Sequence, residues 1–257
     1  MITKDSEATL ENCLKSVAEL ASEIILVDDG SKDKTVEIAK RYGARIFQKE
    51  LKSFGAQKEF ALSQANEDWI FLIDSDETAT PALIEEIRKS LSGNHSFNAY
   101  KVPRRNFYFQ KWLKHGAKYP DHQVRLYKKN RVHFSSNIVH EKVMVEGEVG
   151  VLKNWIDHFS YTDMDTWFKK LKMFSEFNAE ELYRKGVKPT PLNFARFCVL
   201  NPLWRFDKRY FLKLGFLDGL PGLIACVHDA LTEILTYMQL SQKCKMGLKD
   251  DRCQDHR

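Results

Sequence analysis

Apolar and polar residues alternate in two patterns over the first hundred positions. One set recurs at helical spacing and predicts an amphipathic helix: Leu10, Cys13, Leu14, Val17 and Leu20. Short apolar runs, typical of buried parallel strands, lie at 24–27, 44–47 and 69–73. Further helices are expected at 35–42, 54–65 and 81–91. Strands that alternate with helices predict βαβ units, and hence a mainly parallel sheet with helices on both faces.

The pattern changes after residue 97. Residues 101–131 hold ten Lys or Arg and a single acid, Asp121, interleaved with aromatic side chains. Strand-like and loop-like segments continue to about 161, and the chain then becomes helical. We therefore expect a domain over 1–161 with parts 1–97 and 98–161, a helical extension over 162–244 and a polar tail over 245–257.

Charge divides the chain at the same place. Residues 1–97 hold 12 Lys or Arg against 18 Asp or Glu, a net charge of −6, and residues 98–257 carry +11. The composition, 43% hydrophobic and 29% charged, fits a globular protein and excludes collagen-like and largely disordered chains. Five scattered cysteines without a CxxC pair favour free thiols. With no signal-peptide pattern and no apolar run of ~18 residues, these features predict a cytoplasmic protein.

Two acidic turns follow predicted strands. Asp28 and Asp29 come after the run at 24–27, and Asp74 and Asp76 after the run at 69–73. Ligands of open α/β sheets bind at the carboxyl ends of strands, where two such carboxylates suit Mg²⁺ or Mn²⁺. The alternative is that these side chains only cap their own turns.

Four segments, taken in order, carry a resemblance. They are Ile-Thr-Lys at 2–4, Ile-Leu-Val-Asp-Asp-Gly-Ser-Lys-Asp-Lys-Thr at 25–35, Phe-Gly-Ala-Gln-Lys at 54–58 and Trp-Ile-Phe-Leu-Ile-Asp-Ser-Asp-Glu at 69–77. Together they resemble the family 2 inverting glycosyltransferases. The resemblance implies an α/β GT-A fold: a Rossmann-like nucleotide-binding mixed sheet with flanking helices in 1–97, and an acceptor part in 98–161. The helical appendage follows at the C-terminal end.

Three later segments, 119–127, 139–143 and 215–223, resemble the bacterial lipopolysaccharide-core β-glucosyltransferase branch. This similarity implies a metal-dependent transfer from UDP-glucose or a similar UDP-hexose. The implied acceptor is a lipopolysaccharide core or a related anionic envelope glycolipid. The implied location is the cytoplasmic face of the inner membrane.

The resemblance also implies residue roles. Thr3 lies against the nucleoside, Asp29 contacts the uracil and Lys58 approaches the base. Asp74 faces the ribose and the metal, and Asp76 ligates the metal, Mg²⁺ or Mn²⁺.

Inverting transfer needs a general base for the acceptor hydroxyl. Asp121 is our first candidate because it is the only acid in a basic, aromatic stretch; the alternative is an ion pair with a nearby Arg or Lys. Glu141 is the second candidate. His140 is a candidate contact for the metal or the diphosphate, or else a structural histidine.

Two basic regions have open interpretations. Residues 101–131 are a solvated face, an acceptor groove for an anionic glycolipid or, less favoured because no recognised motif is present, a nucleic-acid surface. Residues 205–240 are helices packed on the catalytic domain or a basic amphipathic surface at a membrane.

Only Met1 and Ile2 precede Thr3, so the first strand is short, and we expect a weakened sheet there. Two rival functions follow. A nucleotidyltransferase also uses acidic pairs, but the Gly-rich phosphate loop typical of that class is missing. A catalytically impaired module that binds a membrane or a nucleic acid is the other rival.

Overall fold

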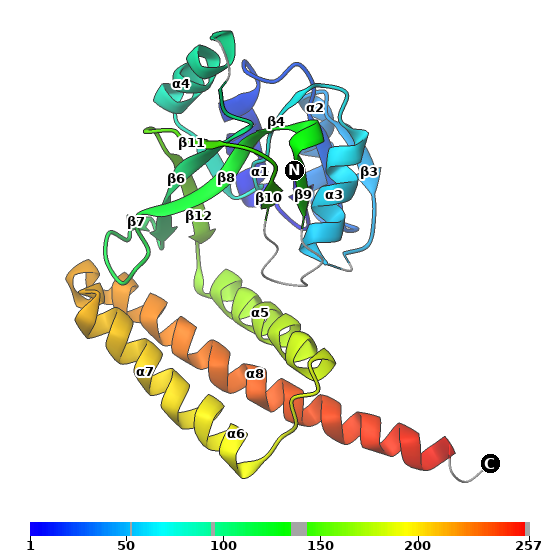
Figure 1. The fold of residues 1–257 in the computed structure, drawn as a ribbon, viewed down its shortest axis with the longest axis vertical. Coiled ribbons are helices and arrows are strands. Elements are labelled where there is room, and N and C mark those ends of the chain that lie inside the picture. Colours follow the sequence, from blue (N-terminus) through cyan, green and yellow to red (C-terminus); the bar gives the residue numbers. More distant parts are fainter. Residues whose placement is uncertain (52, 94–95, 135–142, 255–257) are drawn as a thin grey trace. The chain divides into compact units, whose positions relative to one another are not determined.

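The structure is a computed structural model that describes residues 1–51, 53–93, 96–134 and 143–254, with side chains as far as residue 246. The chain forms two compact units, which are drawn in Figure 1. The first consists of Met1–Phe107 and Tyr119–Ser160, and the second of Tyr108–Lys118 and Tyr161–Arg257. Residues 108–118, which the sequence assigned to the acceptor part, thus belong with the helical unit.

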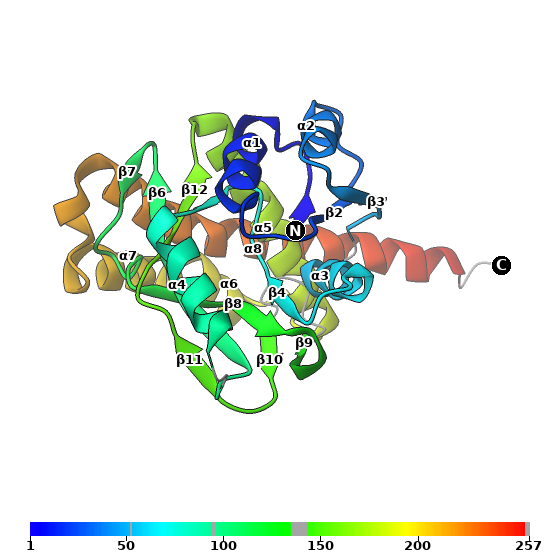
Figure 2. The ribbon, with the colours of Figure 1, turned by 90° about the horizontal axis from the view of Figure 1, so that it is seen from above.

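A three-stranded parallel sheet begins the first unit. Its strands, in spatial order, are β1 (Ile2–Thr3), β2 (Ile25–Asp28) and β3 (Arg45–Gln48). The accompanying helices are α1 (Glu7–Val17), α2 (Thr35–Arg41) and α3 (Phe54–Gln64). Figure 2 shows α1 and α2 on one side of this sheet and α3 on the other. The predicted helices and strands are confirmed here to within a few residues. Their apolar residues are buried as the pattern predicts; in α1 these are Leu10, Cys13, Leu14 and Val17.

A larger mixed sheet completes the first unit. Its main strands, in spatial order, are β4 (Trp69–Phe71), β8 (Asp121–Lys128), β6 (Ala99–Tyr108), β12 (Ile156–Tyr161) and β5 (Glu77–Ala79). Two shorter strands, β7 (Lys111–Trp112) and β11 (Val149–Val151), pair with β6, and β9 (Val132–Phe134) pairs with β10 (Val143–Val145). Helix α4 (Pro81–Ser92) begins at Pro81, the predicted first residue of this helix. The short 3-10 turn η1 (Lys129–Arg131) follows β8.

The expectation of a mainly parallel sheet holds only for β1–β3. Strand β4 pairs antiparallel with β8 and is the last strand of its own sheet. Strand β1 is only two residues long, Ile2 and Thr3, and its ladder partner is β2. The backbone groups of β4 are satisfied on β8, so β4 needs no partner in the parallel sheet.

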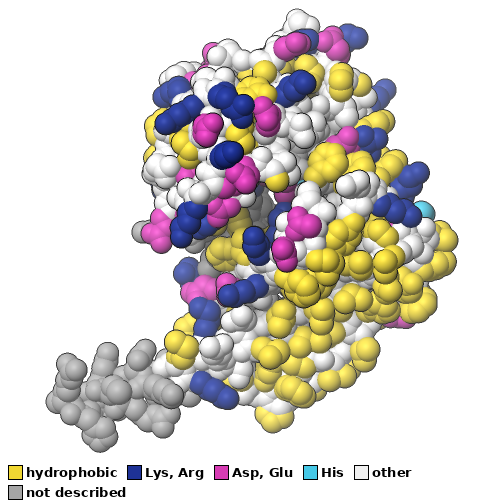
Figure 3. Space-filling model, turned by 180° about the vertical axis from the view of Figure 1, so that it is seen from behind, with side chains coloured by type: hydrophobic (Ala, Val, Ile, Leu, Met, Phe, Trp, Pro, Cys, Tyr) yellow, Lys and Arg dark blue, Asp and Glu magenta, His cyan; other side chains and the backbone are white. Residues whose placement is uncertain are grey.

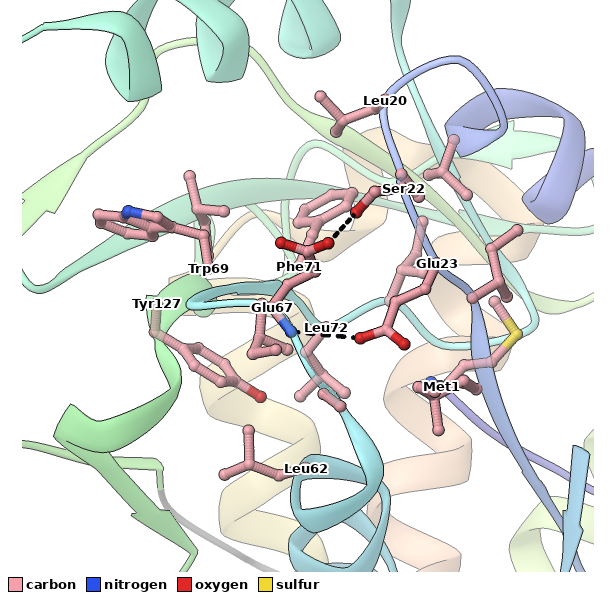
Figure 4. Close-up of a pocket in the computed structure, with 18 of the residues that line it drawn as sticks. Met1, Leu20, Ser22, Glu23, Leu62, Glu67, Trp69, Phe71, Leu72 and Tyr127 are labelled. Atoms are coloured by element: carbon pink, nitrogen blue, oxygen red, sulfur yellow. Dashed lines mark hydrogen bonds between the residues drawn. The ribbon is translucent and has the colours of Figure 1, made fainter. Parts of the chain in front are cut away.

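A cavity of about 330 Å³ lies where the two sheets are interrupted. Met1 and Ile25 line it on the side of the parallel sheet, and Trp69 to Ile73 on the side of β4. In the view of Figure 4, Leu72 lies between Tyr127 and Met1, with Leu62 of α3 below. The Met1 ammonium donates to the Ile25 carbonyl at 2.7 Å, and burial lowers the pKa of this ammonium to about 6. The cavity lies beside the first strand, where we expect a weakened sheet.

The second unit is helical, as predicted from residue 163 onward. Its elements are α5 (Met164–Arg184), α6 (Pro191–Ala195), the π-helical turn η2 (Arg196–Leu200), α7 (Asn201–Asp207), the π-helical turn η3 (Lys208–Leu212), the 3-10 turn η4 (Gly215–Asp218) and α8 (Gly219–Gln254). Asp163 caps α5 by accepting from the Thr166 N–H at 2.7 Å. Trp167 and Leu171 of α5 pack with Ala225 of α8 in the core.

Buried ion pairs hold residues 108–118 to this unit. The Lys118 Nζ is 3.0 Å from an Asp229 carboxylate oxygen, and His115 donates its backbone N–H to Asp218 at 2.8 Å. Burial opposes ionisation of Asp229, but Lys118 and Arg209 beside it hold its pKa below the usual range. The four described cysteines are free thiols, as expected.

Within the described residues, no single helix has the length and hydropathy to cross a membrane. One pair of helical segments, Pro191–Leu212 and Gly215–Met246, meets the criterion together, with a bend of 71° between them.

Candidate active site

The acidic turn after β2 separates its two aspartates into different roles. Asp28 is fully buried and accepts from the Ser31 N–H at 2.9 Å and from the Gln48 amide at 3.0 Å. Thr3, its partner in the β1–β2 ladder, donates its hydroxyl to Asp28 at 3.3 Å. Asp28 therefore stabilises the turn through Ser31 and fixes the position of Thr3. A shorter or apolar side chain at position 28 would lose these hydrogen bonds.

Asp29, the residue expected at the uracil, is half-buried. One carboxylate oxygen is 2.7 Å from the Lys4 Nζ, and the other accepts from the Leu51 N–H at 2.8 Å. Thr3 and Asp29 lie at the carboxyl ends of neighbouring parallel strands, so the turn that Asp28 stabilises places both at one edge of the sheet.

The second acidic turn, at 74–76, is tied to α3 and β8. An Asp74 carboxylate oxygen is 2.7 Å from the Arg125 guanidinium, and the other is 3.8 Å from the Lys58 Nζ. Burial opposes ionisation of Asp74, but Arg125 and Lys58 hold its pKa well below the ordinary range. Lys58, expected to approach the base, is itself buried on α3 beside this carboxylate.

From Asp74 a series of alternating charges leads to Asp121. Arg125 also binds Glu77, which is fully buried, and Glu77 accepts from Arg104 at 3.1 Å. Arg104 in turn donates Nε and Nη2 to one oxygen of Asp121, at 2.9 and 2.7 Å. The order is Asp74, Arg125, Glu77, Arg104, Asp121, and we call these five residues the charge series. Each buried charge has a partner of opposite sign, as buried ionic groups require.

The side chain of Asp121 is held from several directions. Besides Arg104, the amides of Asn106 and Gln123 donate to it at 3.1 and 2.6 Å. Burial opposes ionisation, but the charge of Arg104 and these hydrogen bonds lower the pKa of Asp121. The ion pair that the sequence left as an alternative is present, and it also orients an ionised carboxylate.

Asp76 lies beside a histidine from β12. His158 Nε2 is 3.5 Å from an Asp76 oxygen, and Nδ1 is 2.7 Å from the Asn106 amide oxygen. His158 stands opposite Glu77 in the β5–β12 ladder, which brings it to the turn at 74–76. His158 thus links the Asp76 turn to Asn106 and, through Asn106, to Asp121.

The side chains near Asp76 fit a divalent cation that arrives with a diphosphate. Within the described parts of the chain, no three His, Cys, Asp or Glu side chains converge as a closed ligand set. Mg²⁺ in phosphate-transfer sites is held by one or two carboxylates and takes its other ligands from phosphate oxygens and water. Asp76 supplies such a carboxylate, and Asp74 is the second one in the same turn. His140 and Glu141 lie outside the described residues.

Several site residues were not singled out from the sequence: Glu77, Arg104, Asn106 and Arg125. His158 was not singled out from the sequence either. Residues 104 and 106, and 121, 123 and 125, have the spacing of one strand face, but Arg105 and His122 between them are also polar, so no alternation marked this face in the sequence. Arg104 stands directly opposite Asp121 in the β6–β8 ladder.

Comparisons with known proteins bear on the family of the chain. A model of the family "Glycosyl transferase family 2" matches residues 1–144. The lipopolysaccharide core biosynthesis glycosyltransferase LpsC of Rhizobium meliloti is 27% identical over 265 residues, 97% of this chain and 95% of its own. An uncharacterized glycosyltransferase of Rickettsia typhi is 27% identical over 254 residues, 94% of this chain and 85% of its own.

Solved structures with similar folds are more distant. TarS 1–349 of S. aureus superposes with a TM-score of 0.47 at 15% identity, over 90% of this chain and 87% of its own. Glucosyl-3-phosphoglycerate synthase of Mycobacterium tuberculosis, solved with Mn²⁺ and UDP-glucose, has a TM-score of 0.34 at 23% identity, over 42% of this chain and 41% of its own. Since the family model covers more than half of the sequence, the chain belongs to glycosyl transferase family 2 and is a glycosyltransferase of the GT-A fold with a helical C-terminal region.

Proposed function

We propose that this glycosyltransferase transfers a hexose from a UDP-linked donor, UDP-glucose or a similar sugar, to a lipopolysaccharide core or a related envelope glycolipid, with inversion. The observation that carries the proposal is the charge series, which links the acidic turn at 74–76 to Asp121 inside one unit. The relative named for lipopolysaccharide core biosynthesis, which aligns over nearly the whole chain, supports the class of acceptor.

The donor half of the proposal rests on the edge formed by β1 and β2. Thr3 and Asp29 are assigned to the nucleoside, with Asp29 accepting from a base N–H. Lys58 and Arg125 flank Asp74 and supply positive charge beside the turn where the diphosphate is expected. Asp74 is assigned to the ribose and the metal.

We assign Asp76, with Asp74, to a Mg²⁺ or Mn²⁺ ion, and His140 to the same ion or the diphosphate. When bound, such an ion neutralises the negative charge that develops on a diphosphate leaving group. His158 contacts Asp76 and Asn106 together, so it positions the Asp76 carboxylate.

We assign Asp121 as the base that takes the proton from the acceptor hydroxyl, with Glu141 as the second candidate. Arg104, Asn106 and Gln123 position its carboxylate, and its lowered pKa keeps it ionised at neutral pH. The lowered pKa also makes the Asp121 carboxylate a weaker base. In-line attack requires the acceptor hydroxyl within hydrogen-bond reach of this carboxylate and opposite the diphosphate leaving group.

Because the acceptor is a lipid-linked saccharide, we place the reaction at the cytoplasmic face of the inner membrane. The basic, aromatic stretch 101–131 is assigned to the anionic acceptor rather than to nucleic acid, because Arg104 and Arg125 from it bind the site carboxylates.

A donor and acceptor screen tests the proposal. UDP release is measured from several UDP-hexoses, with and without purified lipopolysaccharide core from which the lipid chains have been removed, and with or without EDTA. We expect release that requires core, a UDP-hexose and a divalent metal. Full activity in EDTA would contradict the metal assignment. Calorimetric titration with UDP and Mn²⁺ that showed no binding would favour the impaired module instead.

A further inference from the structure

The helical unit leaves many large apolar side chains exposed. Among the described residues, twelve between positions 192 and 220 are exposed: Leu192, Phe194, Val199, Leu200, Leu203, Trp204, Phe211, Leu212, Leu214, Phe216, Leu217 and Leu220. They come from α6, α7, the turns η2 to η4 and the start of α8. We call these twelve residues the apolar face. Figure 3 shows a broad field of hydrophobic side chains over this part of the chain.

Such a face needs a partner. Monomeric proteins rarely expose a contiguous apolar patch larger than a few hundred Å², and larger patches mark sites of contact with proteins or membranes. Leu192, Leu203 and Leu220 are each more than 60% exposed, so they contribute almost nothing to the core of the unit. The side chains of the apolar face therefore lie on the surface and are not needed to fill the core of the unit.

A basic cavity opens among the residues of this face. It measures about 310 Å³ and is lined by Ala117, Trp204, Arg205, Lys208, Arg209 and Lys213. Glu233 pairs with Arg205 at 2.8 Å, and Asp229 pairs with Arg209. Within the described part of the chain, Lys208 and Lys213 make no salt bridge to an acid. The cavity thus carries an excess of positive charge beside an indole ring.

Charge decides between the possible occupants. A symmetric contact of two copies centred on the cavity would bring its basic residues close to those of the other copy, which is unfavourable. An anionic bilayer accepts both features, because apolar side chains enter the acyl boundary while Lys and Arg reach phosphate groups.

We propose that the apolar face docks on an anionic lipid bilayer and that the cavity between Trp204 and Lys213 binds the phosphate of a lipid headgroup. The proposal rests on the membrane location given under the proposed function, and it adds the face that makes the contact and the headgroup site. No covalent step is involved.

Vesicle co-sedimentation of the full chain, without donor or acceptor, tests the proposal. We expect binding to vesicles with about 30% phosphatidylglycerol and much weaker binding to pure phosphatidylcholine. Each basic residue near an anionic surface contributes ~1 kcal/mol, so the double variant Lys208→Glu/Lys213→Glu is expected to weaken binding by at least about 10-fold. The matched control, Lys169→Glu/Lys172→Glu on the exposed side of α5, changes net charge equally and is expected to bind nearly as the parent does.

A second variant tests the apolar part. Leu203→Ser/Leu217→Ser is expected to weaken binding to both kinds of vesicle, with unchanged circular dichroism. Equal losses in the Lys208/Lys213 variant and its control would overturn the headgroup site. Saturable binding of inorganic phosphate that the Lys208/Lys213 variant abolishes, with no vesicle binding, would also overturn the lipid assignment. A stable dimer that Leu203→Ser/Leu217→Ser dissociates, without vesicle binding, would assign the face to a second copy.

The two proposals fail separately. The transfer assay uses core without lipid chains and needs no membrane, whereas the vesicle assay needs no transfer. Loss of vesicle binding with normal UDP release would therefore reject the docking surface and leave the reaction standing.

Discussion

The two units treat charge and apolar surface in opposite ways. In the first unit, the exposed large apolar residues that the structure describes are only Met144 and Val151, while Glu77 and Arg125 are buried. In the second unit, the twelve residues of the apolar face are exposed. Burying charge is costly unless each group is paired and positioned, and exposing apolar surface is costly unless it is covered. The difference fits the proposed roles, with the active site in the first unit and a docking surface on the second.

The largest expected effect is on the chemistry of the first unit. Asp76→Ala is expected to reduce kcat/KM for transfer by about 10³-fold or more, because the carboxylate assigned to the metal is lost, and with it the cation that would neutralise the leaving diphosphate. Circular dichroism is expected to stay unchanged. Asp68→Ala, an exposed aspartate before β4, is the control and is expected to keep full activity. Nearly full activity of Asp76→Ala would contradict the assignment of the metal site to this turn.

The next effect concerns the base. Asp121→Asn is expected to lower kcat by about 10²- to 10⁴-fold while UDP affinity, measured by calorimetry, is kept. Because Arg104 lowers the pKa of Asp121, the acid limb of the parent pH profile is expected below the ordinary ~3.9 of a free aspartate. Near-normal turnover in Asp121→Asn, together with loss of turnover in Glu141→Gln, would make Glu141 the base.

The charge series should also matter for stability. Arg125→Met removes the cation that Asp74 and Glu77 share, leaving Asp74 only Lys58 at 3.8 Å and Glu77 only Arg104, and it is expected to cost about 3–5 kcal/mol in the free energy of unfolding. Arg131→Met, which removes an exposed contact to Glu146 at 3.6 Å, is expected to cost no more than about 1 kcal/mol. Urea denaturation of both variants measures the difference. Equal costs would mean that the series is not buried in solution.

A smaller effect concerns the Met1 ammonium beside the cavity. Its pKa is about 6 in the folded chain and near 8 when unfolded, so the unfolded state binds more protons between these values. The free energy of unfolding is therefore expected to rise by about 2 kcal/mol from pH 5.5 to pH 8.5. Adding Gly-Ser-Gly ahead of Met1 moves the charge away and should flatten this dependence. An unchanged slope in that variant would place the titration on another group.

The smallest effect is expected on the apolar face. Leu203→Ser is expected to change the free energy of unfolding by no more than about 0.5 kcal/mol, because this side chain is exposed. Leu171→Ser, a buried position of α5, is the contrast and is expected to cost about 3 kcal/mol or more. Thermal melts of the two variants compare them. A large cost for Leu203→Ser would mean that the face is packed in solution, and the contrast between the units would fail.

The local elements of the first hundred residues could be predicted because their signals are local. The helix that buries Leu10 and Leu14 and the strand at 25–28 depend on periodicities of a few residues. The acidic turns were found for the same reason, since strand ends are visible in the sequence. The helical character after residue 163 was predicted in the same way.

The charge series could not be assembled from these signals. Arg125 lies 51 positions from Asp74, and Arg104 lies 27 positions from Glu77. Their meeting depends on the register of β6, β8 and β12, which no short pattern specifies when both faces of a strand are partly polar. The sequence therefore identified Asp121 as a candidate without showing which arginine would hold it.

By itself the sequence determined the order of helices and strands, the two acidic turns, the family and the opposite net charges of the two halves. Only the tertiary structure decided that β4 leaves the parallel sheet, that Asp28 serves the turn while Asp29 stands at its edge, and that the apolar residues of 192–220 stay exposed. The physical reason is range. Periodicity and turn chemistry act between neighbours in the chain, whereas strand register, ion pairing and burial are settled between residues that only folding brings together.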